Sequence, residues 1–292
     1  MPLPNCLVIG AMRSGTSTLY QLLAQHPDVF MSTPKEPNYF AFADMPDIPV
    51  EASDSVTNLA DYERLFQDSA EASVRGEASH NYLYYSDRAA PLIRRTLPDV
   101  RLVAILRNPV DRAFSHYMLH VRNEKEHAAT FREALDLESV RIERGDQFGH
   151  YVARGFYAQQ LGPFLQQFPS DALRIFLYED LAGDAVGLAQ DVYGYLGIDA
   201  SFAPDTAVRS NPSGVPRNRA VHGLLVKDNA VKRALQPLLP RSAYRLAVRI
   251  RDRNLNQESM DPEIRSELAA VFRPEIEALQ EVVDRDLSAW LL

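Results

Sequence analysis

The sequence predicts a three-layer α/β/α fold in which helices cover both faces of a central parallel sheet. Short apolar runs bounded by turn residues alternate with longer amphipathic segments along the first 197 residues, and strands that alternate with helices form parallel sheets. The predicted strands span residues 7–9, 102–106 and 173–177, with a weaker candidate around Val74. The predicted helices span residues 16–26, 86–96, 110–121, 131–143 and 157–168.

The character of the sequence changes after Gly197. A polar loop, PDTAVRSNPSGVPRNR, precedes a part that is predicted to be all-helical up to the last residue. The last long helix should begin at Asp261, which can cap it, and Pro262, which suits the first helical position, and Pro274 should kink or break it. We therefore expect a single domain over residues 1–292, with an α/β core (1–197) and a loop followed by a mostly helical part (198–292).

The composition argues against several classes of protein. Hydrophobic residues make up 46% and charged residues 24% of the 292 residues, as in a globular protein with a full core. The net charge of −8 argues against a nucleic-acid-binding protein, because such proteins need positive faces toward phosphate. The only cysteine, Cys6, fits a reducing compartment. The sequence also lacks an apolar run of about 18 residues, as a membrane span would need, so we expect a cytoplasmic enzyme.

The stretch LVIGAMRSGTSTLYQLLAQHP has the form of a phosphate-binding (P-loop) unit. Gly10 and Gly15 allow a sharp turn after the first strand, and the next helix then points its free N–H groups at an anion. A pair of glycines at this spacing is weak evidence alone, but Arg13 and a cluster of hydroxyl side chains strengthen it. Thr16 stands where a nucleotide-hydrolysing loop has its lysine. The candidate hydroxyl donors are those of Ser14, Thr16, Ser17 and Thr18.

A second anion site is predicted where the strand 102–106 ends. A nucleotide-hydrolysing enzyme needs an acidic residue at such a strand end to hold Mg²⁺, whereas this strand ends in Arg107-Asn108-Pro109. A basic strand end suits an anion, and an arginine fork matches phosphate oxygens. Because no metal-binding motif occurs elsewhere in the sequence, we expect no metal. These features disfavour a P-loop phosphotransferase, which is the first alternative function.

The segment GAMRSGTSTL, followed by LRNPVDRAFSHY, resembles the sulfotransferases that use 3′-phosphoadenosine 5′-phosphosulfate (PAPS) as donor, above all bacterial relatives of the heparan-sulfate type. The similarity extends over KEPNYF, GEASHNYL, RGFYAQQL, IFLYEDL and the closing MDPEIRSELAAVFRPEIEAL. It implies that the P-loop holds the 5′-phosphosulfate, that Arg107 and Ser115 clamp the 3′-phosphate, and that adenosine 3′,5′-bisphosphate (PAP) is released. The acceptor would be a hydroxyl or amine of a small molecule, a carbohydrate or a carrier-bound group.

The resemblance also suggests the catalytic groups. Arg13 occupies a position where the family usually has lysine. It can stabilise charge on the leaving oxygen but donates no proton readily. The glutamate base of the heparan-type enzymes corresponds to Glu36, and a looser match places His80 near the histidine base of the cytosolic branch. We rank Glu36 first and His80 second, although an imidazole (pKa near ~6.5) suits the role better than an unperturbed carboxylate (~4.3). Ala78 replaces a lysine that is frequent in the heparan-type group, so a non-catalytic PAP-binding protein is the second alternative.

Further residues are assigned by their place in the resemblance. Tyr157 corresponds to a position near the purine, and Arg217 and Arg219 lie where relatives close a loop over the 3′-phosphate. His116 and His120 flank the second motif. A place on the helix surface is expected for both, with a position lining the cleft as the alternative.

Two charged stretches have open interpretations. Residues 37–63 contain six acids and no basic residue. They should form a solvated surface excursion, with a border of the active site as the alternative. Residues 224–253 contain eight basic residues and two aspartates. They form either a solvated face or a landing patch for an anionic acceptor.

Overall fold

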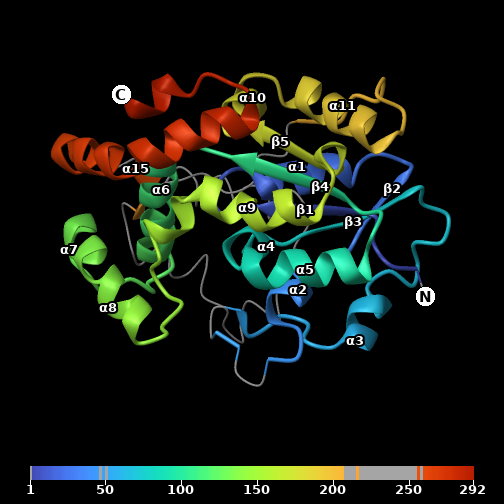
Figure 1. Cartoon of the computed structure of the whole chain (residues 1–292), viewed down its shortest axis with the longest axis horizontal. Helices are drawn as coiled ribbons and strands as arrows, with labels where there is room; N and C mark the ends of the chain where they lie inside the picture. Colours follow the sequence, from blue (N-terminus) through green and yellow to red (C-terminus); the bar gives the residue numbers. More distant parts are fainter. Residues whose placement is uncertain (1, 46–47, 50–51, 207–214, 217–254, 257–258) are drawn as a thin grey trace, which may run out of the picture.

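Five strands form one parallel sheet at the centre of the computed structural model (Figure 1). The structure describes residues 2–45, 48–49, 52–206, 215–216, 255–256 and 259–292. The strand order is β2-β3-β1-β4-β5, so the first strand is central. This arrangement confirms the predicted three-layer fold. The strands are β1 (Cys6–Gly10), β2 (Val29–Met31), β3 (Val74–Ala78), β4 (Arg101–Leu106) and β5 (Leu173–Leu177).

Helices cover both faces of the sheet, because alternate residues of each strand point to opposite sides. In β1, Leu7 and Ile9 belong to one buried cluster, and Cys6 and Val8 belong to the other. Helices α2, α4, α5, α6, α9 and α15 contribute to the first cluster, and α1, α10 and α11 to the second. The α-helices are α1 (Thr16–Leu23), α2 (Tyr39–Phe42), α3 (Leu59–Arg64), α4 (Asn81–Tyr84), α5 (Ser86–Thr96), α6 (Pro109–Arg122), α7 (Phe131–Asp136), α8 (Glu138–Glu143), α9 (Tyr157–Gln167), α10 (Tyr178–Gly183), α11 (Ala185–Leu196) and α15 (Pro262–Val283).

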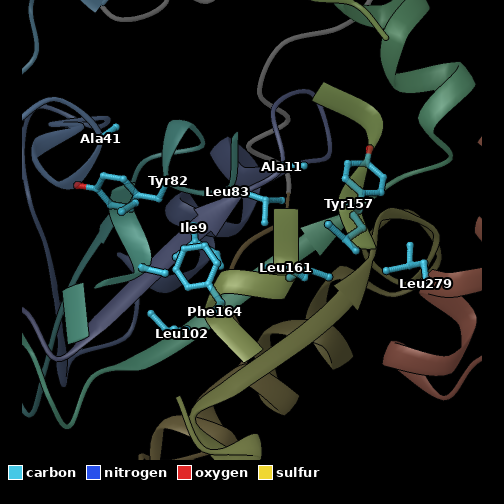
Figure 2. Packing of buried hydrophobic residues seen from close by; sticks show 14 of the residues in the cluster. Ile9, Ala11, Ala41, Tyr82, Leu83, Leu102, Tyr157, Leu161, Phe164 and Leu279 are labelled. Carbon is cyan, nitrogen blue, oxygen red and sulfur yellow. The ribbon is translucent and has the colours of Figure 1, made fainter. Parts of the chain in front are cut away.

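The first cluster fixes the end of β1 from which the P-loop departs. Figure 2 shows Ile9 and Leu83 close to Leu161 of α9 within this packing. A Cβ atom at Gly10 would lie 2.7 Å from the Cβ of Leu83, so only glycine fits where β1 passes α4. The start of the P-loop is therefore held by core packing.

Several elements differ from the predictions. Strand β2 has three residues, and helices α10 and α11 follow β5 in turn. The apolar pattern indicated none of these three elements. The segment 131–143 forms two helices, α7 and α8, that meet at Leu137. Helix α15 continues through Pro274, so the predicted break is wrong. Glu275 of α15 accepts the backbone N–H groups of Ala158 (in a short contact) and Gln159 (3.1 Å), and this docking on α9 accounts for the unbroken helix.

The part after Gly197 is not all-helical. Strands β6 (Val215–Pro216) and β7 (Leu255–Asn256) pair in an antiparallel ladder. The predicted loop contacts Arg217 and Arg219, and the basic segment 224–253, lie outside the described residues. Among the described helices, none combines the length and the apolar character that crossing a membrane requires.

Candidate active site

The P-loop turn presents the N-terminus of α1 to a cavity of about 240 Å³, which we name the loop cavity. Gly15 has φ of +100°, and a Cβ atom there would lie 2.6 Å from Leu181. Glycine is therefore required both by conformation and by space. Within the described part of the chain no side chain caps α1, so its first N–H groups remain available to an anion. The loop cavity is lined by Met12, Arg13, Gly15, Thr16, Ser17, Thr18, Glu36, His80, Arg107, Leu119 and Tyr178.

Arg107 and Tyr178 also line the loop cavity, and both lie next to the P-loop. Leu106 of β4 pairs with Leu177 of β5, so the residues that follow these strands are neighbours. The guanidinium carbon of Arg107 lies 4.6 Å from the ring centre of Tyr178, a stacking arrangement that favours a cation. The sequence analysis gave Tyr178 no role. Tyr178 could have been predicted to lie beside Arg107 if the pairing of β4 with β5 had been known.

Arg13 connects the P-loop to the predicted 3′-phosphate site. Its Nε donates to Oγ of Ser115 at 3.1 Å, and its carbonyl oxygen lies 3.5 Å from Nη1 of Arg107. Burial, together with the charges of Arg122 and Arg107, lowers the pKa of Arg13 to about 10. The structure thus brings Arg13, Arg107 and Ser115 together. Concentrated positive charge of this kind is stabilised by an anion.

Glu36 and His80 form a pair that lies on the wall of the loop cavity. His80 Nδ1 lies 3.2 Å from Glu36 Oε1, and Lys35 makes a short contact with the same oxygen. Burial raises the pKa of Glu36, but the charges and hydrogen bonds of His80 and Lys35 outweigh it and hold that pKa well below its usual range. Glu36 therefore remains an ionised hydrogen-bond acceptor, which orients the His80 ring and leaves Nε2 for another partner.

A second cavity of about 180 Å³, which we name the histidine cavity, shares four residues with the loop cavity. The shared residues are Met12, Glu36, His80 and Leu119. The Glu36–His80 pair therefore faces both spaces. The other lining residues are Asn38, Phe42, Pro49, Ala52, Asn81, Tyr85, His116, His120, Asn123, Lys125, Gln147 and Arg154.

The histidine cavity corrects two expectations. His116 and His120 are 2% and 7% exposed, so they lie in the interior and not on the helix surface, because the loop around Tyr151 packs over this side of α6. Phe42, Pro49 and Ala52 line the same cavity, so part of the acidic segment 37–63 borders the site, whereas its acids Asp44 and Asp54 are exposed.

Hydrogen bonds fix the tautomer of His120. Tyr151 has one hydroxyl proton and donates it to Glu126 Oε2 at 2.6 Å. The 3.1 Å contact between the Tyr151 oxygen and His120 Nδ1 therefore requires Nδ1–H to donate. Burial lowers the pKa of His120 to about 4, and burial together with the charge of His120 lowers that of His116 well below its usual range. Both rings are neutral near pH 7, so the histidines give the cavity polar surface without charge, whereas Glu36, Lys125 and Arg154 on the same wall are charged groups.

Two other residues predicted to bind the ligand are buried and, like Ser115, are not part of the lining of the loop cavity. Tyr157 is 1% exposed and belongs to the core (Figure 2), where its hydroxyl donates to the carbonyl oxygen of Arg107 at 3.0 Å. This hydrogen bond fixes the backbone of Arg107, and Tyr157 is not among the residues that line the loop cavity or the histidine cavity. Ser14 is fully buried and is absent from the lining of the loop cavity. Among the described residues no three His, Cys, Asp or Glu side chains gather as metal ligands would, and the expectation that the reaction needs no metal stays a prediction.

Comparisons with known proteins identify the family of the chain. The model of the Sulfotransferase family matches residues 4–203. Heparan sulfate glucosamine 3-O-sulfotransferase 6 from Homo sapiens is 30% identical over 203 residues, and the match covers 67% of this chain and 52% of that protein. Heparan sulfate glucosamine 3-O-sulfotransferase 3A1 from Mus musculus is 27% identical over 197 residues, covering 67% and 46%. The chain thus spans about half the length of these relatives.

A solved structure extends the likeness to the whole chain. The crystal structure of a sulfotransferase from Alicyclobacillus acidocaldarius superposes with a TM-score of 0.77 at 30% identity, and the match covers 99% of both chains. The family match, the relatives and this structure confirm the resemblance to PAPS-type sulfotransferases. The chain therefore belongs to the sulfotransferase family.

Proposed function

We propose that the chain transfers the sulfuryl group of PAPS to a hydroxyl or amine of an acceptor that enters the histidine cavity. The observation that carries the proposal is the position of Glu36 and His80 on the wall shared by two cavities. One cavity has the groups that bind anions, and the other is polar and uncharged near the histidines. A base between them reaches both the donor and the acceptor.

The loop cavity suits the two anionic ends of PAPS. The uncapped N–H groups and hydroxyls at the start of α1 would hold the 5′-phosphosulfate. Arg107, Ser115 and Arg13, which lie together beside this cavity, would hold the 3′-phosphate through charged hydrogen bonds. Arg217 and Arg219 lie outside the described residues, and their contact with the same phosphate stays a prediction from the resemblance.

The Glu36–His80 pair would remove the proton from the acceptor. Oε1 of Glu36 is already in contact with Lys35 and lies 3.2 Å from His80 Nδ1, so Glu36 is engaged as an acceptor within the pair. We therefore assign proton uptake to His80 Nε2, and we assign to Glu36 the orientation of the ring and the stabilisation of the imidazolium. This reverses the order of the two residues expected from the sequence.

The transfer would be an in-line displacement at sulfur. The acceptor oxygen or nitrogen forms a bond to sulfur while the bond from sulfur to the bridging oxygen breaks, and the acceptor proton goes to His80. The electron pair of the broken bond stays on the 5′-phosphate of PAP. The N-terminus of α1 and the positive charge of Arg13 would stabilise that leaving oxygen.

The acceptor belongs to one of three classes: a small molecule, a carbohydrate or a carrier-bound group. The names of the two mammalian relatives specify heparan sulfate glucosamine as their acceptor. Lys125 and Arg154 on the wall of the histidine cavity favour a neutral or anionic acceptor over a cationic one.

Incubation with PAPS and a panel of these acceptors tests the proposal, with mass spectrometry to detect an added sulfo group and PAP. We expect sulfation with EDTA present. PAP binding without transfer to any acceptor would indicate a non-catalytic protein, and a requirement for Mg²⁺ with ATP as donor would indicate a phosphotransferase.

A further inference from the structure

A buried carboxylate lies directly behind the Glu36–His80 pair. Glu77, the fourth residue of β3, is completely buried and accepts hydrogen bonds from three hydroxyl groups. Tyr62 donates to Oε1 at 3.1 Å, Tyr82 makes a short contact with the same oxygen, and Ser79 donates to Oε2 at 2.8 Å. A buried charge is costly unless it is compensated in this way.

One of the three donors connects Glu77 to the segment that carries Glu36. Ser79 Oγ accepts the backbone N–H of Asn38 at 3.0 Å, and Asn38 Nδ2 donates to the carbonyl oxygen of Glu36 at 2.9 Å. Ser79 also precedes His80 in the chain. Ser79 therefore connects Glu77 to Glu36 through hydrogen bonds, by way of Asn38, and to His80 through the backbone.

The segment 36–38 needs such support because its backbone is strained. Glu36 has φ of +66° and Asn38 has φ of +55°, in the left-handed region that non-glycine residues adopt at a cost of about 1–2 kcal/mol each. The N–H of Glu36 donates to the carbonyl oxygen of Ala78 at 3.1 Å. The segment thus docks on the end of β3, and the Ser79–Asn38 bond is its second anchor there.

The proton positions of the network give it one preferred arrangement. Ser79 has one hydroxyl proton, and the Asn38 N–H already occupies its oxygen as an acceptor, so its proton must go to Glu77. Only an acceptor at Oε2 satisfies this chain of bonds. Burial raises the pKa of Glu77 to about 7, against the lowering effect of the three hydroxyl donors, so the donors are what keeps an ionised form accessible near neutral pH.

We propose that Glu77 and Ser79 are positioning residues for sulfuryl transfer, which hold Glu36 and His80 in place through the chain Glu77–Ser79–Asn38. The inference rests on the proposed function of the Glu36–His80 pair. Neither residue lines the loop cavity or the histidine cavity, so neither touches a ligand. The alternative is that the network only stabilises the core.

Two matched substitutions separate these roles, because each removes one hydroxyl donor from the same buried carboxylate. Ser79→Ala also removes the bond to Asn38, whereas Tyr62→Phe leaves that bond in place. Release of sulfate from PAPS, with water as the acceptor, gives a rate that needs no identified acceptor. We expect Ser79→Ala to lower this rate roughly 10- to 100-fold, as displaced catalytic groups do, with PAP affinity unchanged, and Tyr62→Phe to alter neither quantity.

The position of the His80 ring can also be tested by NMR, without catalytic turnover. In the PAP-bound protein, the imidazole ¹H–¹³C NMR signal of His80, assigned through His80→Asn, should shift in Ser79→Ala and stay in place in Tyr62→Phe. The inference would be overturned if Ser79→Ala and Tyr62→Phe lost the same rate of sulfate release in proportion to their loss of melting temperature. It would also be overturned if Ser79→Ala changed neither the rate nor the NMR signal of His80. Failure of the proposed function is distinguishable, since it would appear in the wild-type protein as absence of sulfate release and of acceptor sulfation.

Discussion

The loop cavity and the histidine cavity share a wall but are built in different ways. The loop cavity takes its anion-binding groups from consecutive residues at strand ends, where backbone N–H groups and arginines converge. The histidine cavity takes its lining from scattered positions in α2, α4, α6 and the loops around Lys125 and Gln147. The first is fixed by the fold and suits a constant donor, whereas the second depends on local packing and can differ between relatives with different acceptors.

The largest expected effect concerns the wall that both cavities share. His80→Ala should lower kcat by roughly 10²–10⁴-fold, the usual contribution of a general base, and leave PAP affinity unchanged. Glu36→Gln should lower kcat less, because it removes orientation but leaves the imidazole. Steady-state kinetics and calorimetry with PAP measure the two quantities. A larger loss in Glu36→Gln than in His80→Ala would return the role of base to Glu36.

Replacing one cation in each cavity sharpens the comparison. Arg107→Ala should weaken PAP binding roughly 10- to 100-fold, since hydrogen bonds to charged groups contribute about 1.5–3 kcal/mol, without a matching loss of folding stability. Lys125→Ala, in the histidine cavity, is the control and should leave PAP affinity intact. Calorimetric titration that found equal losses in both variants would contradict the division into donor and acceptor spaces.

The buried neutral histidine predicts a pH effect of intermediate size. The pKa of His120 falls from 6.5 to about 4 on folding. Below pH 6.5 the unfolded chain therefore binds a proton that the folded chain does not, and stability is lost as the pH falls toward 4. Wild type should lose about 2 kcal/mol more than His120→Gln between pH 7 and pH 5. Urea unfolding at both pH values measures this, and parallel losses would show that His120 is protonated in the folded protein.

The smallest expected effect concerns Tyr157. Tyr157→Phe removes the hydrogen bond to the carbonyl oxygen of Arg107, which should lower stability by about 1 kcal/mol and weaken PAP binding only a few-fold. Thermal unfolding and calorimetry provide the check. Loss of PAP affinity as large as that of Arg107→Ala would mean that the hydroxyl contacts the nucleotide directly.

The two cavities also differ in how far the sequence could predict them. Gly15, Thr16 and Arg107 stand next to apolar strands, so local patterns place them correctly at the edge of the sheet. Helix α11 and the three-residue β2 were missed, because the strand is shorter than a periodic pattern needs and the helix has no clear polar face. Tyr178 could have been found only from the pairing of β4 with β5.

The histidine cavity depends on tertiary contacts that no local pattern contains. His116 and His120 lie one turn apart on α6, where the amphipathic pattern suggests an exposed face. Their burial follows from Tyr151, which is 31 residues beyond His120 and approaches within hydrogen-bond distance of it. Tyr157 shows the reverse case. It was assigned to the purine by its place in a family motif, and the structure shows that its side chain is buried in the core, so contact with the purine stays a prediction.

A crystal structure of the protein with PAP tests the central claim most directly. The account predicts the 5′-phosphate at the N–H groups of Gly15–Thr18, the 3′-phosphate at Arg107 and Ser115, and the Glu36–His80 pair between the 5′-phosphate and an open histidine cavity. PAP bound in the histidine cavity, or bound with neither phosphate at Arg107, would contradict it.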